Sequence, residues 1–267
     1  MASGSLKSVM GIQIMNEYLK NLNRIEFVIT WACTGRCKHC SEGEHTDCGE
    51  HIDAEVAAQA VYDICKNYDI RSLMTFGGEP LLYPETVCRI HKAAKEMGIP
   101  QRDLITNGYF SKDEKRIREV VHMLAESGVQ DILLSVDAFH QETIPLEPVK
   151  YFAECVKAEG IALRLSPAWL VSKEDDNPYN VRTREVLAEF AYLDVPVGSG
   201  NIIFPSGNAL KYLSEYFKEG EVPENPYEDD PKDIRAIGFN PDGTVLDGNV
   251  YEKNIVEIIK YYKGENT

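Results

Sequence analysis

Three closely spaced cysteines are the strongest chemical signal in the sequence. Cys33, Cys37 and Cys40 follow the pattern CxxxCxxC. Three thiolates this close can bind three irons of a cubane iron–sulfur cluster and leave the fourth iron open to a substrate or cofactor. A structural zinc site is the competing interpretation, and His39 or Cys48 could supply its fourth ligand. The spacing favours the cluster, because structural zinc sites commonly use two separated pairs of ligands.

A glycine pair followed by a carboxylate is the second signal. The residues are Gly77, Gly78, Glu79 and Pro80, directly after a short apolar run. Two glycines let the backbone approach a ligand closely, and the carboxylate can pair with an ammonium group. Such a sequence by itself is commonly an ordinary turn. Its place at the end of a predicted strand makes it a candidate binding loop.

Short β-branched runs alternate with helical patterns from residue 24 onward, which predicts a parallel sheet with right-handed crossovers. The predicted strands are residues 24–31, 71–76, 103–106, 131–137, 161–166 and 201–204. The predicted helices are residues 55–68, 84–97, 111–128, 146–159, 182–192 and 209–217. Periodicity by itself leaves a barrel and an open sheet as alternatives.

Polar residues gather near the carboxyl ends of these strands. They are Asn107, Ser135, Asp137, Arg164 and, just after the fourth strand, His140. Parallel α/β folds build their sites at this end of the sheet, so these residues are candidate site residues. The alternatives are that Asn107 and Ser135 close turns, and that Arg164 and His140 are surface residues.

The order and spacing of these motifs resemble the radical S-adenosylmethionine (SAM) superfamily over roughly residues 24–210. The resemblance implies that Cys33, Cys37 and Cys40 hold a [4Fe-4S] cluster, whose open iron chelates the amino and carboxylate groups of SAM. It also implies that the loop with Glu79 contacts the SAM amino group. The position of His39 is usually aromatic in that family.

Further SAM contacts follow from the same resemblance. Ser135 and Asp137 would lie near the ribose or methionine part, and Arg164 near the carboxylate. Asn107 is a further candidate contact. Ile203, in the sixth predicted strand, could form an apolar wall for adenine, although core packing explains it equally well.

The resemblance implies an α/β fold, a partial (β/α)6 TIM barrel of parallel strands with a small C-terminal hairpin–helix extension. Residues 1–23 are predicted as an N-terminal tag or lead-in, 24–218 as the core domain, and 219–267 as a linker and extension. The extension is predicted to contain a hairpin over 234–248 and a helix over 252–262. Segments 205–209 and 241–249 resemble remnants of a SPASM or twitch extension, which lacks cluster ligands here because no cysteine follows Cys155.

Composition limits the partners. The chain has a formal net charge of −15, which argues against nucleic acid and anionic membranes as partners. No apolar run reaches the roughly 20 residues that a membrane-spanning helix needs. The odd number of cysteines argues against a disulfide framework. We expect a cytoplasmic location, since the cluster must be kept reduced.

The resemblance implies an enzyme that takes one electron from a flavodoxin- or ferredoxin-like donor and cleaves SAM to a 5′-deoxyadenosyl radical, which abstracts hydrogen from a substrate. A peptide is the leading expectation, and a nucleoside, sugar or amino acid is the alternative. A glycyl-radical activase and a non-enzymatic iron–sulfur scaffold or electron carrier also remain open. Cys48 could donate a hydrogen atom to the substrate radical or be an incidental loop thiol, and His140 could relay a proton.

Overall fold

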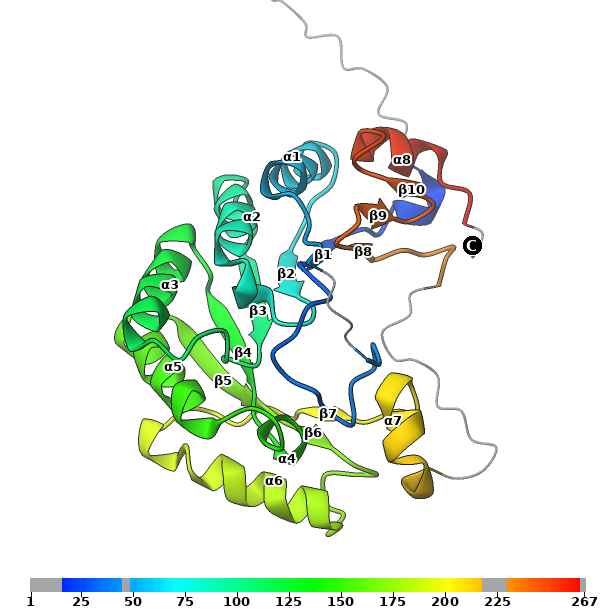
Figure 1. The fold of residues 1–267 in the computed structure, drawn as a ribbon. Coiled ribbons are helices and arrows are strands. Elements are labelled where there is room, and N and C mark those ends of the chain that lie inside the picture. Colours follow the sequence, from blue (N-terminus) through cyan, green and yellow to red (C-terminus); the bar gives the residue numbers. More distant parts are fainter. Residues whose placement is uncertain (1–15, 45–48, 218–229, 265–267) are drawn as a thin grey trace, which may run out of the picture.

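The computed structural model describes residues 16–44, 49–217 and 230–264. A six-stranded sheet with the order β5-β4-β3-β2-β1-β8 forms its centre (Figure 1). Its strands are Arg24–Val28 (β1), Ser72–Phe76 (β2), Gln101–Thr106 (β3), Asp131–Ser135 (β4), Ala162–Ser166 (β5) and Ala236–Phe239 (β8). All neighbouring pairs are parallel, so the predicted α/β fold with a partial barrel is confirmed.

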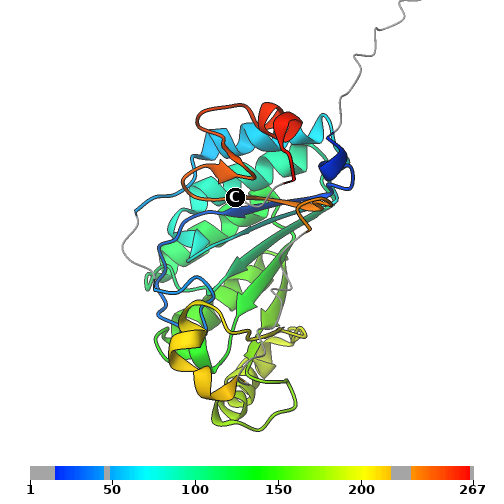
Figure 2. The ribbon, with the colours of Figure 1, turned by 90° about the vertical axis from the view of Figure 1, so that its right-hand side faces the viewer.

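Helices cover the outer face of this curved sheet (Figures 1 and 2). The helices on this face are Ala54–Cys65 (α1), Pro84–Glu96 (α2), Glu114–Ser127 (α3) and Leu146–Ala158 (α5). The other helices are Ala138–Gln141 (α4), Pro178–Ala188 (α6), Gly207–Tyr212 (α7) and Ile255–Tyr261 (α8). Short 3-10 helices occupy Glu17–Leu19, Pro80–Leu82, Ala191–Leu193 and Ser214–Tyr216. Asp53 starts α1 by accepting hydrogen bonds from the N–H groups of Glu55 and Val56, a strong N-terminal cap.

The two faces of the sheet differ because side chains alternate along each strand. Ile25 and Phe27 of β1, like Leu104 of β3 and Ile132 of β4, point toward the helices and form part of the main apolar core. The opposite face carries charged residues instead, among them Glu26, Asp131 and Arg164. Core packing therefore uses one face and leaves the inner face of the partial barrel polar.

The sixth predicted strand does not join the main sheet. Asn201–Ile202 (β7) pairs in parallel with Ala168–Trp169 (β6) as a separate two-stranded sheet. The N–H of Leu165 donates to the Pro196 carbonyl, and the N–H of Gly198 donates to the Leu165 carbonyl. The segment that precedes β7 therefore still lies beside β5. Proline lacks the N–H group that a continuous ladder requires, and Pro167 and Pro196 account for the interruption.

The sheet's other edge also differs from the sequence prediction. The predicted hairpin over residues 234–248 supplies β8 instead, which pairs with β1 in parallel. Phe239 of β8 stacks on Phe27 with ring centroids 4.6 Å apart, so burial of this ring favours the sheet over a separate hairpin. The remaining hairpin is short, Thr244–Val245 (β9) with Gly248–Asn249 (β10).

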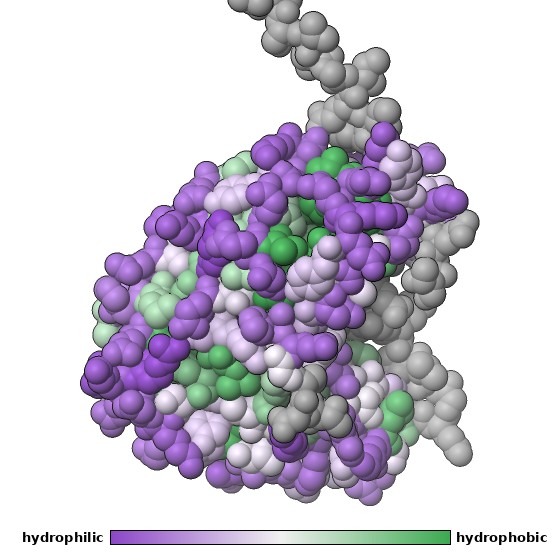
Figure 3. All heavy atoms as spheres, turned by 45° about the horizontal axis from the view of Figure 1, so that its top comes forward, coloured by the Kyte–Doolittle hydropathy of each residue, from purple (hydrophilic) through white to green (hydrophobic). Residues whose placement is uncertain are grey.

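The C-terminal helix α8 packs beside α1. Asn254 caps its N-terminus and also donates to Asp63 of α1 at 2.8 Å. Asn16 donates to the carbonyls of Ile259 and Tyr262 at the other end of the helix. The face drawn in Figure 3 is mostly hydrophilic, with apolar residues in small separate patches. No helix in the described ranges is long and apolar enough to cross a membrane.

Candidate active site

The three cysteines lie in the loop after β1, at the carboxyl end of the sheet. Cys37 is buried, and Cys33 and Cys40 are partly buried. The guanidinium of Arg36 donates to the carbonyls of Cys33 and Gly35 at 2.7 and 2.8 Å, and fixes the first turn of the loop. Gly35 packs tightly there, because a Cβ at this position would lie 3.1 Å from the Ile144 side chain and 3.2 Å from the Cys37 sulfur.

Burial raises the pKa of all three thiols. Burial, followed by the charge of Glu79, raises the pKa of Cys33 to about 11. Burial raises the pKa of Cys37 even further, with additional contributions from Asp137, Cys33 and Cys40, and burial also raises that of Cys40. Thiols of this kind stay protonated until a metal supplies positive charge. A cluster of three soft donors on one buried loop fits an iron–sulfur centre that has one open iron.

The glycine pair brings the second motif against this loop. The N–H of Gly78 donates to the Thr30 carbonyl at 2.7 Å, and that of Glu79 to the Ala32 carbonyl at 2.8 Å. A Cβ on Gly78 would lie 2.1 Å from the Ala32 oxygen, and Gly77 has a φ of +140°. Glycine is therefore required at both positions, and the two motifs are joined directly by backbone.

Glu79 is fully buried and is held by three donors. The Thr106 hydroxyl donates to it at 2.7 Å, and the N–H groups of Leu81 and Asn107 donate at 2.9 Å. Burial raises the pKa of Glu79 to about 7 despite these bonds. A cationic ligand group would favour the ionised form, so Glu79 is suited to receive an ammonium.

Asn107 links the third strand to the cysteine loop. Its side-chain amide donates to the Thr34 hydroxyl at 3.2 Å and lies 3.6 Å from the Cys33 sulfur. Its side-chain oxygen accepts the N–H of Tyr109, which closes the turn after β3. Asn107 therefore closes a turn and contacts the loop at the same time.

Buried Asp137 and partly buried His140 form a pair next to Cys37. Asp137 caps α4, accepts the N–H of Ala168 at 3.0 Å, and lies 2.8 Å from His140 Nδ1 in a hydrogen bond. Burial opposes its charge, but His140 outweighs this effect, and the pKa of Asp137 lies far below its ordinary value. Among the described residues, ligand atoms of Cys37, His39 and His140 lie within 4.8 Å of one another. The structure thus places His140 at the site rather than on the surface.

The remaining predicted residues are more dispersed. Ser135 ends β4 opposite Ser166 of β5. Arg164 pairs with Asp131 at 3.0 Å on the inner face of the sheet. Ile203 is buried in a small apolar cluster with Cys37, whereas Cys48 lies outside the described residues.

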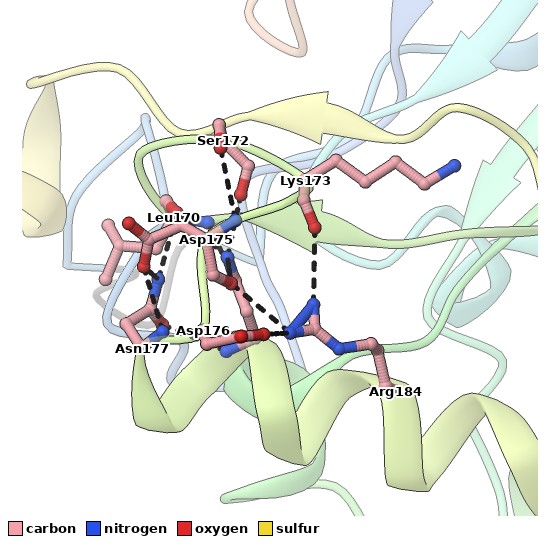
Figure 4. A network of polar contacts seen from close by, with 8 residues as sticks. Leu170, Ser172, Lys173, Asp175, Asp176, Asn177 and Arg184 are labelled. Carbon is pink, nitrogen blue, oxygen red and sulfur yellow. Dashed lines mark hydrogen bonds and ion pairs between the residues drawn. The ribbon is translucent and has the colours of Figure 1, made fainter.

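The loop between β6 and α6 borders the same apolar cluster through Leu170. Figure 4 shows the polar contacts within this loop and with the helix that follows it. Buried Asn180 accepts the N–H of Leu170 and donates to the carbonyls of Leu170, Ser172 and Asp175. The side chain of Arg184 donates to Asp176, which secures the outside of the loop. This loop is therefore a preorganised border of the site.

Asn208 of α7 also contacts the cysteine loop, a contact that no sequence motif predicted. Its N–H donates to the Cys40 carbonyl at 2.9 Å, and its side chain to the Cys37 carbonyl at 3.1 Å. Glycine and asparagine in segment 205–209 were the available signal, but no local pattern indicates which loop they contact.

Comparison with known proteins identifies the family. Residues 27–158 match the Radical SAM superfamily. The chain is a radical SAM enzyme. A probable GTP 3′,8-cyclase of Saccharolobus islandicus (strain L.S.2.15 / Lassen #1) is 26% identical over 264 residues, covering 93% of this chain and 78% of that protein.

Solved structures share the fold of this radical SAM enzyme. Native anSMEcpe with bound AdoMet has a TM-score of 0.58 at 14% identity, and the match covers 91% of this chain and 81% of that one. BtrN in complex with AdoMet and 2-DOIA has a TM-score of 0.51 at 16% identity, with coverage of 92% and 84%. The family uses a [4Fe-4S] cluster and SAM as its cofactors.

Proposed function

We propose that this radical SAM enzyme acts on a small polar molecule, with Cys33, Cys37 and Cys40 as the cluster ligands. The main support for this site is that hydrogen bonds join the cysteine loop, Glu79 and Asn107 at one end of the sheet. When bound, the reduced cluster and SAM supply a 5′-deoxyadenosyl radical for hydrogen abstraction. The protein's part is to hold the reactants and exclude water.

SAM would be oriented by groups around the cysteine loop. Glu79 receives the ammonium group of SAM, because that positive charge would stabilise the ionised carboxylate. The hydrogen bond from Thr106 already fixes the position of the carboxylate. Gly77 and Gly78 keep the backbone beside it free of side chains. Asn107 and Ser135 offer hydrogen bonds at neighbouring strand ends, and Pro80 closes the loop.

The adenosine part would lie toward Asp137 and Ile203. Ile203 contributes an apolar wall in the cluster that also contains Cys37 and Phe139. Asp137 keeps His140 in one orientation beside Cys37, which suits His140 to hold a proton near the reacting centre. The role of Cys48 as a hydrogen-atom donor stays a prediction.

The inner face of the sheet offers charged groups to a small polar substrate, which was the alternative to the peptide expected first. Arg24, Glu26, Asp131 and Arg164 line this face, and each side chain is about one-quarter to two-fifths exposed. Charged groups of both signs orient a polar ligand and disfavour an apolar one. The relative named GTP 3′,8-cyclase makes purine nucleotides the first substrates to test. Arg164, paired with Asp131, then serves the substrate or the SAM carboxylate.

A flavodoxin- or ferredoxin-like protein would supply the electron in a reducing cytoplasm. The cluster loop meets solvent at Arg36, which is exposed. Because the chain as a whole is strongly negative, a basic residue at this point favours approach of an acidic donor to the loop.

The test is anaerobic reconstitution with iron and sulfide, reduction with dithionite, and assay of 5′-deoxyadenosine formed from SAM. We expect product from the wild type and none from the Cys33→Ala, Cys37→Ala, Cys40→Ala triple variant. A panel of nucleotides, amino sugars and short peptides is then compared for stimulation of product formation. Stimulation by peptides alone would overturn the small-molecule proposal, and absence of a cluster would overturn the cysteine assignment.

A further inference from the structure

One short segment outside the known motifs contacts the cysteine loop at several points. Segment 205–209 leads into α7 and lies against residues 37–43. The hydroxyl of Ser206 donates to the Ser41 carbonyl at 3.2 Å, and Asn208 donates to the carbonyls of Cys37 and Cys40. We call segment 205–209 the loop brace.

The bonds made by Asn208 complete those of the loop itself. The Cys37 carbonyl already accepts the N–H of Cys40 at 3.2 Å, and the Cys40 carbonyl accepts that of Gly43 at 3.3 Å. A carbonyl oxygen has two lone pairs, and Asn208 supplies the second donor to each. The backbone positions of two cysteines are therefore fixed by one residue that is only 8% exposed.

Close packing supports the same interpretation. Gly207 has a φ of +49°, and a Cβ there would lie 2.3 Å from the Ser41 oxygen and 2.6 Å from the Cys40 oxygen. Ala209 of the brace packs in the apolar cluster that contains Cys37, together with Leu213, which follows the brace. The brace therefore touches the loop through backbone, side chain and apolar contacts.

We propose that Asn208 is a positioning residue for the iron–sulfur cluster. It holds the backbone of Cys37 and Cys40 so that both sulfurs keep the spacing that a cubane requires. Loops without regular secondary structure move readily, and ligand-supporting contacts commonly alter metal affinity about 10- to 100-fold. This inference rests on the proposed cysteine ligation.

Two variants test the brace independently. Asn208→Asp keeps the size of the side chain but replaces the amide donor by a carboxylate, which repels the Cys37 carbonyl. Gly207→Ala keeps Asn208 and forces the brace away from the loop by steric contact. Asn254→Ala is the matched control, because Asn254 caps α8 beside α1 and contacts Asp63 rather than the cysteine loop.

The measurement is the rate at which a chelator removes iron from each anaerobically reconstituted protein, together with the electron paramagnetic resonance spectrum of the reduced cluster. We expect iron loss about tenfold faster than wild type for both brace variants, with an altered spectrum. The control should match the wild type in both. Circular dichroism reports whether each variant is folded.

The outcomes separate the two proposals. An iron-free wild type would overturn the cysteine ligation and the brace with it. A wild type with a cluster and an Asn208→Asp variant that matches it in rate and spectrum would overturn the brace only. If neither variant folds, hydrogen exchange of the wild type decides: cluster loading should slow amide exchange over residues 206–213, and an unchanged rate would refute the inference.

Discussion

Two shielded histidines lie in different regions and have opposite properties. His91 of α2 lies in the helix-packed core, bonded to the Thr75 hydroxyl at 2.9 Å, and burial lowers its pKa to about 3. His140 lies at the carboxyl end of the sheet and bonds Asp137 at 2.8 Å. Burial also opposes its charge, but the charge of Asp137 outweighs this effect, and the pKa of His140 is raised.

The difference shows that burial by itself does not make a site. In the core, burial keeps the His91 imidazole neutral, and the charge of Arg102 further opposes its protonation. At the carboxyl end, the charge and hydrogen bond of His140 outweigh burial and keep Asp137 ionised before any ligand arrives, and the N–H groups of Phe139 and Ala168 also donate to it. Such preorganised buried charge is typical of functional sites. Four experiments test this difference between the two regions.

Acidification should give the largest effect, through His91. Its pKa of about 3 in the folded protein lies below the ordinary 6.5, so its stability contribution is complete above pH 6.5 and is lost as the pH falls toward 3. We expect a loss of roughly 4 kcal/mol in the free energy of unfolding across this range. Urea unfolding of the cluster-free protein measures it. His91→Gln should flatten the slope, and an equally steep slope would contradict the assignment.

Removal of the Glu79 charge should weaken SAM binding. Hydrogen bonds to charged groups contribute about 1.5–3 kcal/mol, so Glu79→Gln should lower the affinity about 10- to 100-fold. Because the pKa of Glu79 is about 7, wild-type affinity should fall as the pH drops below 7, and the variant should lack this dependence. Equilibrium dialysis with the reconstituted proteins tests both. Glu85→Gln, an exposed change on α2, is the matched control.

His140 should show a pH dependence opposite to that of His91. Its raised pKa means that its contribution is complete below the unfolded value and is lost as the pH rises through the folded value. His140→Gln should cost on the order of 1.5 kcal/mol at mildly acidic pH and less at alkaline pH. Urea unfolding of cluster-free protein tests this, with exposed His122→Gln as the control. A loss that is the same at every pH would argue against a charged His140.

Asn254→Ala should give the smallest effect and mark the region without site chemistry. Loss of this helix cap should cost about 1 kcal/mol in thermal or urea unfolding. Iron content and 5′-deoxyadenosine formation should be unchanged at temperatures where the variant is folded. A change in either would connect α8 to the site, and would weaken the distinction between the two regions.

Much of the fold followed from local patterns. The alternation of strand and helix predicted β1 to β5 and their helices, because side-chain period and capping residues act over a few positions. The pairing of the edges was less predictable. Ile237 and Phe239 form an apolar alternation that suits a hairpin and a sheet edge equally, and only contact with Phe27 distinguishes them.

The candidate site divides in the same way. The cysteine spacing and the Gly77-Gly78-Glu79 sequence were readable directly, because their chemistry depends on neighbours in the chain. The partners of Arg164 and His140 were not, because Asp131 and Cys37 approach them across strands and loops. Asn208 had no local signal, since its donors matter only where they meet distant carbonyls.

Local sequence features were enough to predict the kind of chemistry: three thiols on one loop, a glycine-bordered carboxylate, and a parallel α/β scaffold that brings them to one end. Only the tertiary contacts establish which groups are held charged and what supports the cysteine loop. They also show that His91 lies in the core and His140 at the candidate site. The difference comes from the distance along the chain over which each interaction acts. Ligand spacing and helix capping act within a few residues, whereas burial, desolvation and ion pairing depend on segments that meet only after the chain has folded.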